Sequence, residues 1–242
     1  MLGKSVGVGV MSAALRAGKL GDQGYARMIA TTTKLNTPGP DLAALPGVHA
    51  LADVTGFGLA GHALELARGA RCEVQLDWRA VPLMAGVREL VGQGFVTGAS
   101  GRNWAGYGSD VVIPAGFAAE DQAQLTDPQT SGGLLVSCSP SALDAVLKMF
   151  VQHGFGDAAV VGQIVPANGP PAWSSADRGW VSTKSHQIRE NDKVNSQDRI
   201  GRAGSGIWLG SGAVGHFGVR RTLAATMTAL PKPTCLPGDP TP

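Results

Sequence analysis

The amino-acid sequence predicts an α+β layered domain followed by an irregular tail. Short apolar runs typical of strands alternate with segments of helical periodicity up to about residue 165. A mean hydropathy of +0.06 with 16% charged residues excludes a chain that is disordered throughout. Beyond residue 171 the apolar periodicity is lost, and the sequence is basic and rich in Gly, Ser and Pro. We therefore predict a domain over 1–171 and a disordered tail over 172–242.

The spacing of apolar side chains predicts the helices and strands of this domain. Apolar side chains such as Tyr25 and Met28 recur at spacings of three and four, which predicts a helix over 21–35 that Pro38 ends. Residues 72–77 alternate polar and apolar side chains, as a half-buried strand does. The other expected elements, in chain order, are a strand over 48–54, helices over 62–68 and 81–92, strands over 111–114 and 133–138, a helix over 139–152 and a strand over 158–165.

Composition excludes several classes of protein. The net charge of +2 is too small for the basic face that nucleic-acid binding requires. The 3 cysteines form no CxxC pair, which argues against a disulfide framework or a cysteine zinc site and fits a reducing compartment. No apolar stretch reaches the ~18 residues of a membrane span, and the opening residues lack a signal-peptide core. We expect a cytoplasmic protein with neither nucleic acid nor a membrane as partner.

The first motif, residues 53–62 (DVTGFGLAGH), places a carboxylate where an apolar strand opens into glycines before a helix. Glycines let backbone N–H groups approach phosphate oxygens, and the N-terminus of a helix favours an anion. Asp53 supplies the hard oxygen ligand that Mg²⁺ prefers. The pattern is neither a Walker A nor a GxGxxG motif, so a plain strand–turn–helix connection with Asp53 as a turn or capping residue is the alternative.

The second motif, residues 127–133 (DPQTSGG), gathers a carboxylate, an amide, two hydroxyls and two glycines ahead of an apolar run. This density of small polar groups is typical of a ligand site. A proline-initiated turn that feeds a strand is the alternative.

Three other groups of residues give weaker signals. His49 and His62 have no zinc-site spacing, and we expect surface or capping histidines. Cys72 and Cys138 have no neighbouring His or Lys motif to activate a thiolate, which favours structural roles. Residues 102–104 (Arg-Asn-Trp) suit either a ligand contact through charge, amide and stacking or an exposed loop.

Taken together, four stretches resemble the selenophosphate synthetase family, also called selenide, water dikinase. They are HALADVTGFGLAGHALELARGA, VPLMAGVRELVGQGFVTGASGRNWAGYG, LTDPQTSGGLLVSCSP and VVGQIVPANG. The resemblance covers 1–171 and corresponds to the family's C-terminal half, with residues 2–10 similar to its KPLGTGV-type strand. The family belongs to the aminoimidazole ribonucleotide synthetase superfamily, so the resemblance implies a layered α/β sandwich.

The resemblance also implies a reaction and a set of site residues. The reaction is ATP + selenide + water → selenophosphate + AMP + phosphate, with Mg²⁺ bridging the phosphates. Asp53 matches the family's metal-binding aspartate. On physical grounds we place Thr55, Gly56 and Gly58 near the phosphates. Four residues of the second motif are placed at the same site by their chemistry: Asp127, Gln129, Thr130 and Ser131.

The family's reactive Cys or selenocysteine and its catalytic lysine lie in an N-terminal half without a counterpart in these residues. Lys4 belongs to the strand motif and is not that lysine. We therefore expect no catalytic residue in this chain, inactivity of the chain alone, and partners that comprise ATP, selenide and an N-terminal half or complete synthetase subunit in a homodimer. The alternatives are a non-catalytic module that docks on a complete synthetase, or another ATP-dependent enzyme of the superfamily.

Overall fold

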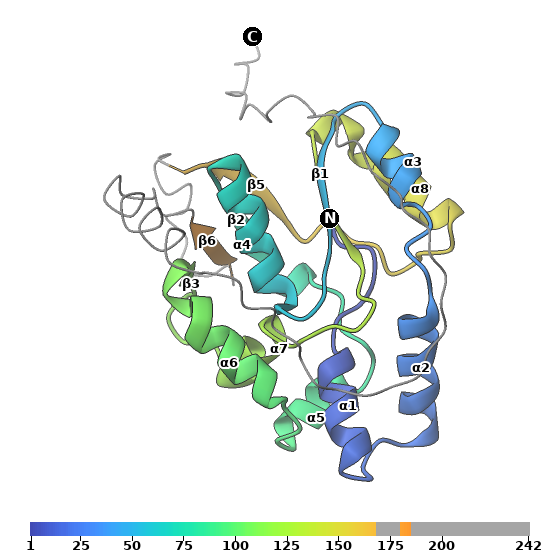
Figure 1. Cartoon of the computed structure of the whole chain (residues 1–242), viewed down its shortest axis with the longest axis vertical. Helices are drawn as coiled ribbons and strands as arrows, with labels where there is room; N and C mark the ends of the chain where they lie inside the picture. The colour runs from blue at the N-terminus through green and yellow to red at the C-terminus, as the bar shows by residue number, and fades with distance from the viewer. Residues whose placement is uncertain (168–179, 185–242) are drawn as a thin grey trace, which may run out of the picture. The chain divides into compact units, whose positions relative to one another are not determined.

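The computed structural model describes residues 1–167 and 180–184 of the 242. In these residues helices surround two antiparallel sheets, which confirms the α+β class (Figure 1). The smaller sheet pairs β1 (Val48–Asp53) with β4 (Leu134–Cys138). The larger has the order β3-β6-β2-β5, with bounds Val111–Val112, Trp180–Lys184, Cys72–Asp77 and Gly162–Pro166.

Helices cover both sheets. α4 packs on β2 and β6, α3 packs on β1 and α8, and α1 lies between α2 and α5. The bounds are α1 Val8–Arg16, α2 Asp22–Thr33, α3 Gly39–Ala44, α4 Gly58–Ala70, α5 Val87–Gly92, α6 Gly98–Tyr107, α7 Ala119–Leu125 and α8 Leu143–Gln152. Short 3₁₀ turns cover Trp78–Ala80, Gly108–Asp110 and Pro140–Ala142. Among the described residues no helix is long and apolar enough to cross a membrane.

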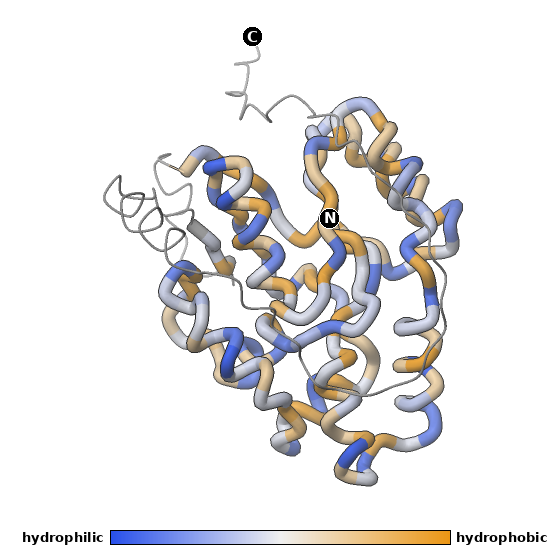
Figure 2. The backbone as a smooth tube through the Cα atoms, viewed as in Figure 1, coloured by the Kyte–Doolittle hydropathy of each residue, from blue (hydrophilic) through white to orange (hydrophobic). Residues whose placement is uncertain are grey.

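Three apolar clusters hold these layers together. Hydrophobic positions are spread along both the helices and the strands (Figure 2). The first cluster joins α4 to the larger sheet and includes Ala63, Leu76 and Val181. The second includes Phe150 of α8 and Val136 of β4. The third packs α1, α2 and α5 around three methionines, Met11, Met28 and Met84. Burial of these apolar surfaces is the main force that stabilises the layers.

The two motifs lie side by side because β1 and β4 pair in register. Asp53 is opposite Leu134, and beyond β1 the Val54 N–H donates to the Gly133 carbonyl at 3.0 Å. The strands approach so closely that a Cβ on Gly132 would stand 2.1 Å from the Val54 carbonyl oxygen. Only glycine fits there. The glycines of the second motif therefore serve the strand pairing.

Most of the expected elements are confirmed, with shifted ends. The expected helix over 21–35 is α2, and the strands over 48–54, 72–77 and 133–138 are β1, β2 and β4. The helix over 62–68 begins earlier, at Gly58. The other confirmed elements are the strand over 111–114, which is β3, the helix over 139–152, which is α8 with a preceding 3₁₀ turn, and the strand over 158–165, which is β5 at 162–166.

Other expectations were wrong. Residues 2–10 do not form a strand, because Leu2 and Val6 make only isolated bridges and α1 begins at Val8. The helix expected over 81–92 is confined to α5. The helices α3, α6 and α7 were not expected. Their sequences are short, and that of α6 is rich in glycine, which weakens helical patterns.

One strand comes from the segment that was expected to be a disordered tail. β6 pairs with β2, with Thr183 opposite Val74, and also with β3. Thr183 is fully buried. The expectation of disorder is therefore wrong for 180–184, where pairing on both sides compensates for a sequence of weak periodicity. The rest of 172–242 lies outside the described residues, and the domain boundary at 171 stays a prediction.

Candidate functional site

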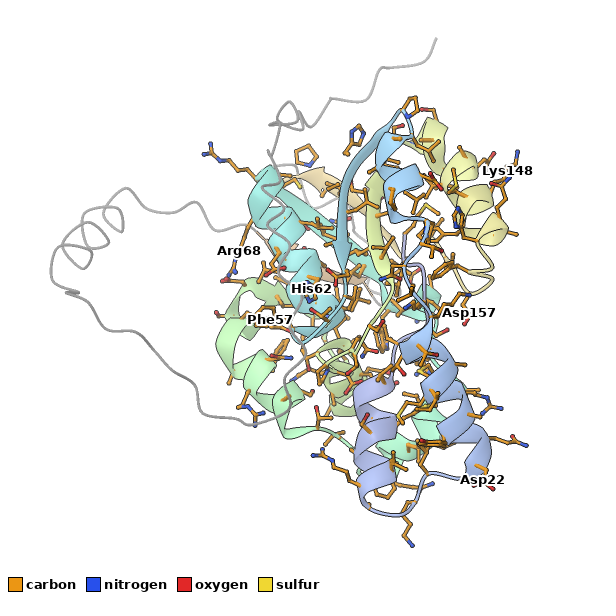
Figure 3. The ribbon with its side chains drawn as sticks, turned by 45° about the vertical axis from the view of Figure 1, so that its right-hand side comes forward. Asp22, Phe57, His62, Arg68, Lys148 and Asp157 are labelled. Atoms are coloured by element: carbon orange, nitrogen blue, oxygen red, sulfur yellow. The ribbon has the colours of Figure 1, made fainter. Side chains whose placement is uncertain are left out.

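The loop that follows β1 is the candidate site. Asp53 and Gly56 are exposed, and Phe57 is 53% exposed at the start of α4 (Figure 3). Among the described residues the Asp53 carboxylate has no hydrogen-bond or ion-pair partner. A Cβ built on Gly56 would meet nothing within 4 Å, so packing does not require that glycine. The loop therefore exposes the Asp53 carboxylate together with the unobstructed backbone at Gly56.

The N-terminus of α4 is uncapped. Its N-cap residue, Phe57, makes no side-chain cap hydrogen bond, and its first turn holds no acidic residue. Gly58 has φ of +71°, and a Cβ there would lie 2.6 Å from the Thr126 carbonyl carbon, so this position requires glycine. The helix start carries partial positive charge, which favours an anion at the loop.

His62 joins the loop to α4 from within. It is 7% exposed, and its Nε2 lies 3.2 Å from Thr55 Oγ1. Its Nδ1 lies 3.1 Å from a carboxylate oxygen of Glu65. The Phe57 ring lies beside the His62 ring, with their centroids 5.9 Å apart (Figure 3). The expectation of a surface or capping histidine is therefore wrong, because this side chain is buried beside the site.

Two side chains of α6 hold the loop in place. The Asn103 amide donates to the Gly56 carbonyl at 2.8 Å and to the Thr126 carbonyl at 3.0 Å. The Tyr107 hydroxyl donates to the Phe57 carbonyl at 2.5 Å, and burial raises the pKa of Tyr107 well above its usual value. Residues 102–104 thus lie on a helix, with Trp104 packed against the first cluster. The sequence had indicated the amide but not its partners.

The carboxylate and amide of the second motif cap a different helix. Asp127 Oδ2 accepts from the backbone N–H groups of Gly9 at 3.0 Å and Val10 at 3.3 Å. Gln129 Oε1 accepts from those of residues 7 and 8, at 3.0 and 3.2 Å. Burial raises the pKa of Asp127 to about 7, against the opposing effect of its hydrogen bonds. The structure therefore brings both side chains to the start of α1.

The other residues of the second motif occupy its outer edge. Thr130 is exposed, and Ser131 has a positive φ of 52° with its carbonyl 2.6 Å from Lys4 Nζ. Lys4 also donates to the Lys34 carbonyl at 2.6 Å. Burial, and secondarily the charge of Lys34, lowers the pKa of Lys4. A ligand role for Asp127, Gln129, Thr130 and Ser131 stays a prediction, whereas their structural contacts are visible.

The loop fits part of a Mg²⁺ site. The described residues contain no group of three or more His, Cys, Asp or Glu that could hold a metal. Proteins commonly bind Mg²⁺ through one or two carboxylates together with substrate phosphates and water. Asp53 and the Thr55 hydroxyl are hard oxygen donors of that kind. Cavities of about 230 and 330 Å³ in the described part of the chain are lined by other residues than those of the loop.

Neither described cysteine is a nucleophile candidate. Cys72 is buried, and burial raises the pKa of the Cys138 thiol. A raised pKa reduces the thiolate fraction that nucleophilic attack requires.

Comparison with known proteins places this fold in a defined class. A family model described as AIR synthase related protein, C-terminal domain, matches residues 1–171. The chain belongs to this family. A solved structure of E. coli HypE covers 68% of this chain and 42% of that chain, with a TM-score of 0.46 and 19% identity.

Within that class, the sequence is similar to proteins named selenide, water dikinase, which confirms the resemblance. The one from Burkholderia pseudomallei (strain K96243) is 62% identical over 165 residues, which are 68% of this chain and 47% of that protein. The one from Pseudomonas straminea is 54% identical over 164 residues, 68% of this chain and 46% of that protein. The chain thus spans about half the length of the curated relatives that it matches.

Proposed function

We propose that this chain supplies the C-terminal half of an enzyme that makes selenophosphate, AMP and phosphate from ATP, selenide and water. The observation that carries the proposal is the open loop at the end of β1. Its exposed Asp53 and unobstructed Gly56 precede the uncapped start of α4, in a chain 62% identical to a selenide, water dikinase. The expected partners are ATP, selenide and the N-terminal half of a synthetase, in a cytoplasmic homodimer.

Each part of the loop has a role in this proposal. Asp53 and Thr55 would hold Mg²⁺, which when bound neutralises charge on the transferred phosphoryl group. Gly56 lets phosphate oxygens approach the backbone, and the dipole of α4 favours their charge. Asn103 and Tyr107 fix the loop carbonyls, so that little reorganisation is needed when the ligand binds. The nucleophile and the catalytic lysine come from the other half.

A chimera tests the proposal. Residues 1–171 would replace the matching segment of the Burkholderia pseudomallei relative, and phosphorus NMR would follow Mg-ATP and selenide under anaerobic reducing conditions. We expect selenophosphate and AMP from the chimera and neither from this chain alone. Asp53→Asn should lower the rate by about 100-fold, the size of effect that loss of one electrostatic contact to the transition state produces. Asp144→Asn, an exposed aspartate on α8, is the matched control.

Two results would count against the proposal. A folded chimera without product, while the intact relative is active, would show that this segment cannot supply the C-terminal half and would favour a docking module. Selenophosphate from the chain alone would show that its own residues suffice, and the shared site would be wrong.

A further inference from the structure

We propose that Glu65 and His62 are positioning residues that hold the Thr55 hydroxyl proton inward, so that its oxygen serves with Asp53 as a ligand for a divalent cation. The inference rests on the proposed function and extends it from one oxygen ligand to a pair. The observation behind it is the chain of contacts from Glu65 through His62 to Thr55, at 3.1 and 3.2 Å.

The direction of these hydrogen bonds follows from the chemistry of their ends. The ionised carboxylate of Glu65 can only accept, so the nitrogen that faces it, His62 Nδ1, carries the ring proton. A neutral imidazole with its proton on Nδ1 leaves Nε2 as an acceptor. In that neutral tautomer the Thr55 hydroxyl is the donor in the 3.2 Å contact. One acidic side chain thereby determines the orientation of a hydroxyl two contacts away.

The oriented hydroxyl keeps its acceptor capacity. A hydroxyl has one proton and two lone pairs, and here the proton is engaged by His62. Among the described residues, no other group bonds Thr55 Oγ1. The backbone of Thr55 is held as well, because its carbonyl accepts from the N–H groups of Gly58 at 3.1 Å and Gln129 at 2.9 Å. Thr55 therefore presents a fixed oxygen between Asp53 and the open Gly56.

Stability alone does not account for the Glu65 contact. The Glu65 side chain is 54% exposed, whereas that of His62 is 9% exposed. Contacts at exposed carboxylates contribute little to folding. A carboxylate that fixes the tautomer of a histidine is instead the arrangement by which outer groups orient metal-site residues. Here the Glu65 carboxylate orients the His62 ring, and the ring in turn orients the Thr55 hydroxyl.

The first test reads the tautomer directly. Nitrogen NMR of the full chain with ¹⁵N-labelled histidine distinguishes the two ring nitrogens. We expect the His62 proton on Nδ1, and we expect Glu65→Ala to yield a mixture of tautomers because the acceptor that fixes the proton is gone. A wild-type His62 that carries a proton on Nε2, in the neutral or in the doubly protonated ring, would overturn the inference, since His62 would then donate to Thr55.

The second test measures metal binding by the chimera described above, in which the other half of the shared site is present. Electron paramagnetic resonance of free Mn²⁺ gives the Kd of the metal alone, without turnover. We expect Thr55→Val, which keeps the shape and removes the oxygen, to raise the Kd by about tenfold, while Thr55→Ser restores binding. His62→Ala should raise it by about tenfold, as loss of an orienting group does. His62→Gln should recover part of the loss, because its amide oxygen accepts the hydroxyl proton.

The outcomes separate the inference from the proposed function. If Asp53→Asn abolishes Mn²⁺ binding but Thr55→Val matches the unsubstituted chimera, the inference fails and the proposed function stands. If the unsubstituted chimera binds no Mn²⁺ while the intact relative does, or binds it as its Asp53→Asn variant does, the assignment of Asp53 fails and the inference with it. Asp144→Asn again serves as the control that leaves binding unchanged, and circular dichroism verifies folding of each variant.

Discussion

Asp127→Asn should remove a pH dependence of stability that the native side chain creates. Asp127 is 1% exposed, and its Oδ2 accepts three N–H donors, from Gly9, Val10 and the Gln129 amide. Its Oδ1 is buried without a partner. Burial outweighs the three hydrogen bonds and raises the pKa from 3.8 to about 7. The folded protein therefore keeps a proton on this group at pH values where the unfolded chain has lost it.

The sign and the size of the effect follow from that difference. Between pH 3.8 and about 7 the folded state binds more protons than the unfolded state, so the free energy of unfolding falls as the pH rises through this range. The stabilisation is complete below pH 3.8 and absent above about pH 7. At about 1.4 kcal/mol for each pKa unit, the full change amounts to about 4 kcal/mol. That is a large part of the 5–15 kcal/mol typical of a whole domain.

Urea unfolding of the full chain at pH 5, 6, 7 and 8 measures this change. Other groups also titrate, so the informative quantity is the difference between the wild type and Asp127→Asn. Asparagine retains an acceptor oxygen for the N–H groups of α1 but has no proton to lose, so the variant should gain stability relative to the wild type as the pH rises. Parallel profiles for the two proteins would refute the reasoning. Asp144→Asn, on the surface, should run parallel to the wild type.

Two further predictions concern the architecture of the loop. Gly132→Ala forces a Cβ to 2.1 Å from the Val54 carbonyl oxygen, so urea unfolding should show a free energy of unfolding lower by about 3 kcal/mol. Gly56→Ala places a Cβ where nothing lies within 4 Å, so it should leave stability unchanged and weaken only ATP binding by the chimera. Asn103→Ala removes the donor to two carbonyls and should cost about 1–3 kcal/mol, and the chimera that carries it should show a raised KM for ATP. Equal destabilisation by Gly132→Ala and Gly56→Ala would contradict the first expectation. An unchanged KM for ATP in the Asn103→Ala chimera would contradict the second.

The sequence predicted the strands well because their signal is local. Residues 72–77 and 133–138 carry their alternating or apolar pattern within six residues, and they form β2 and β4. α1 could not be predicted in this way. Its first N–H groups are bonded by Asp127 and Gln129, side chains more than a hundred positions away. β6 is similar, since its partners are β2 and β3, and no local pattern reveals pairing at that separation.

The candidate site likewise contains residues that the sequence predicts and supporting residues that it does not. Asp53, Thr55 and Gly56 were placed at the site from their types and order. In the loop that follows β1, Asp53 and Gly56 are exposed and Thr55 is partly buried, and their ligand roles stay a prediction. The supports of that loop were missed. Asn103 reaches the Gly56 carbonyl across 47 positions, and Tyr107 reaches the Phe57 carbonyl across 50. Chemistry-bearing residues can be recognised from their types and order, but the residues that hold them are defined by the packing of α6 against the loop.

The helices α1 and α4 begin beside the paired motifs. Side chains bond the N-terminal N–H groups of α1, whereas the N-cap residue of α4 provides no such bond. The start of α1 is filled by a carboxylate and an amide of the second motif, buried within the fold. The start of α4 has no side-chain cap and is preceded by an exposed carboxylate and an open glycine. An N-terminus satisfied by its own chain has no capacity left for an external anion, whereas one without a cap retains it. The start of α4, beside Asp53 and Gly56, therefore retains a capacity for an external anion that the start of α1 lacks, and the ligand roles of both motifs stay predictions.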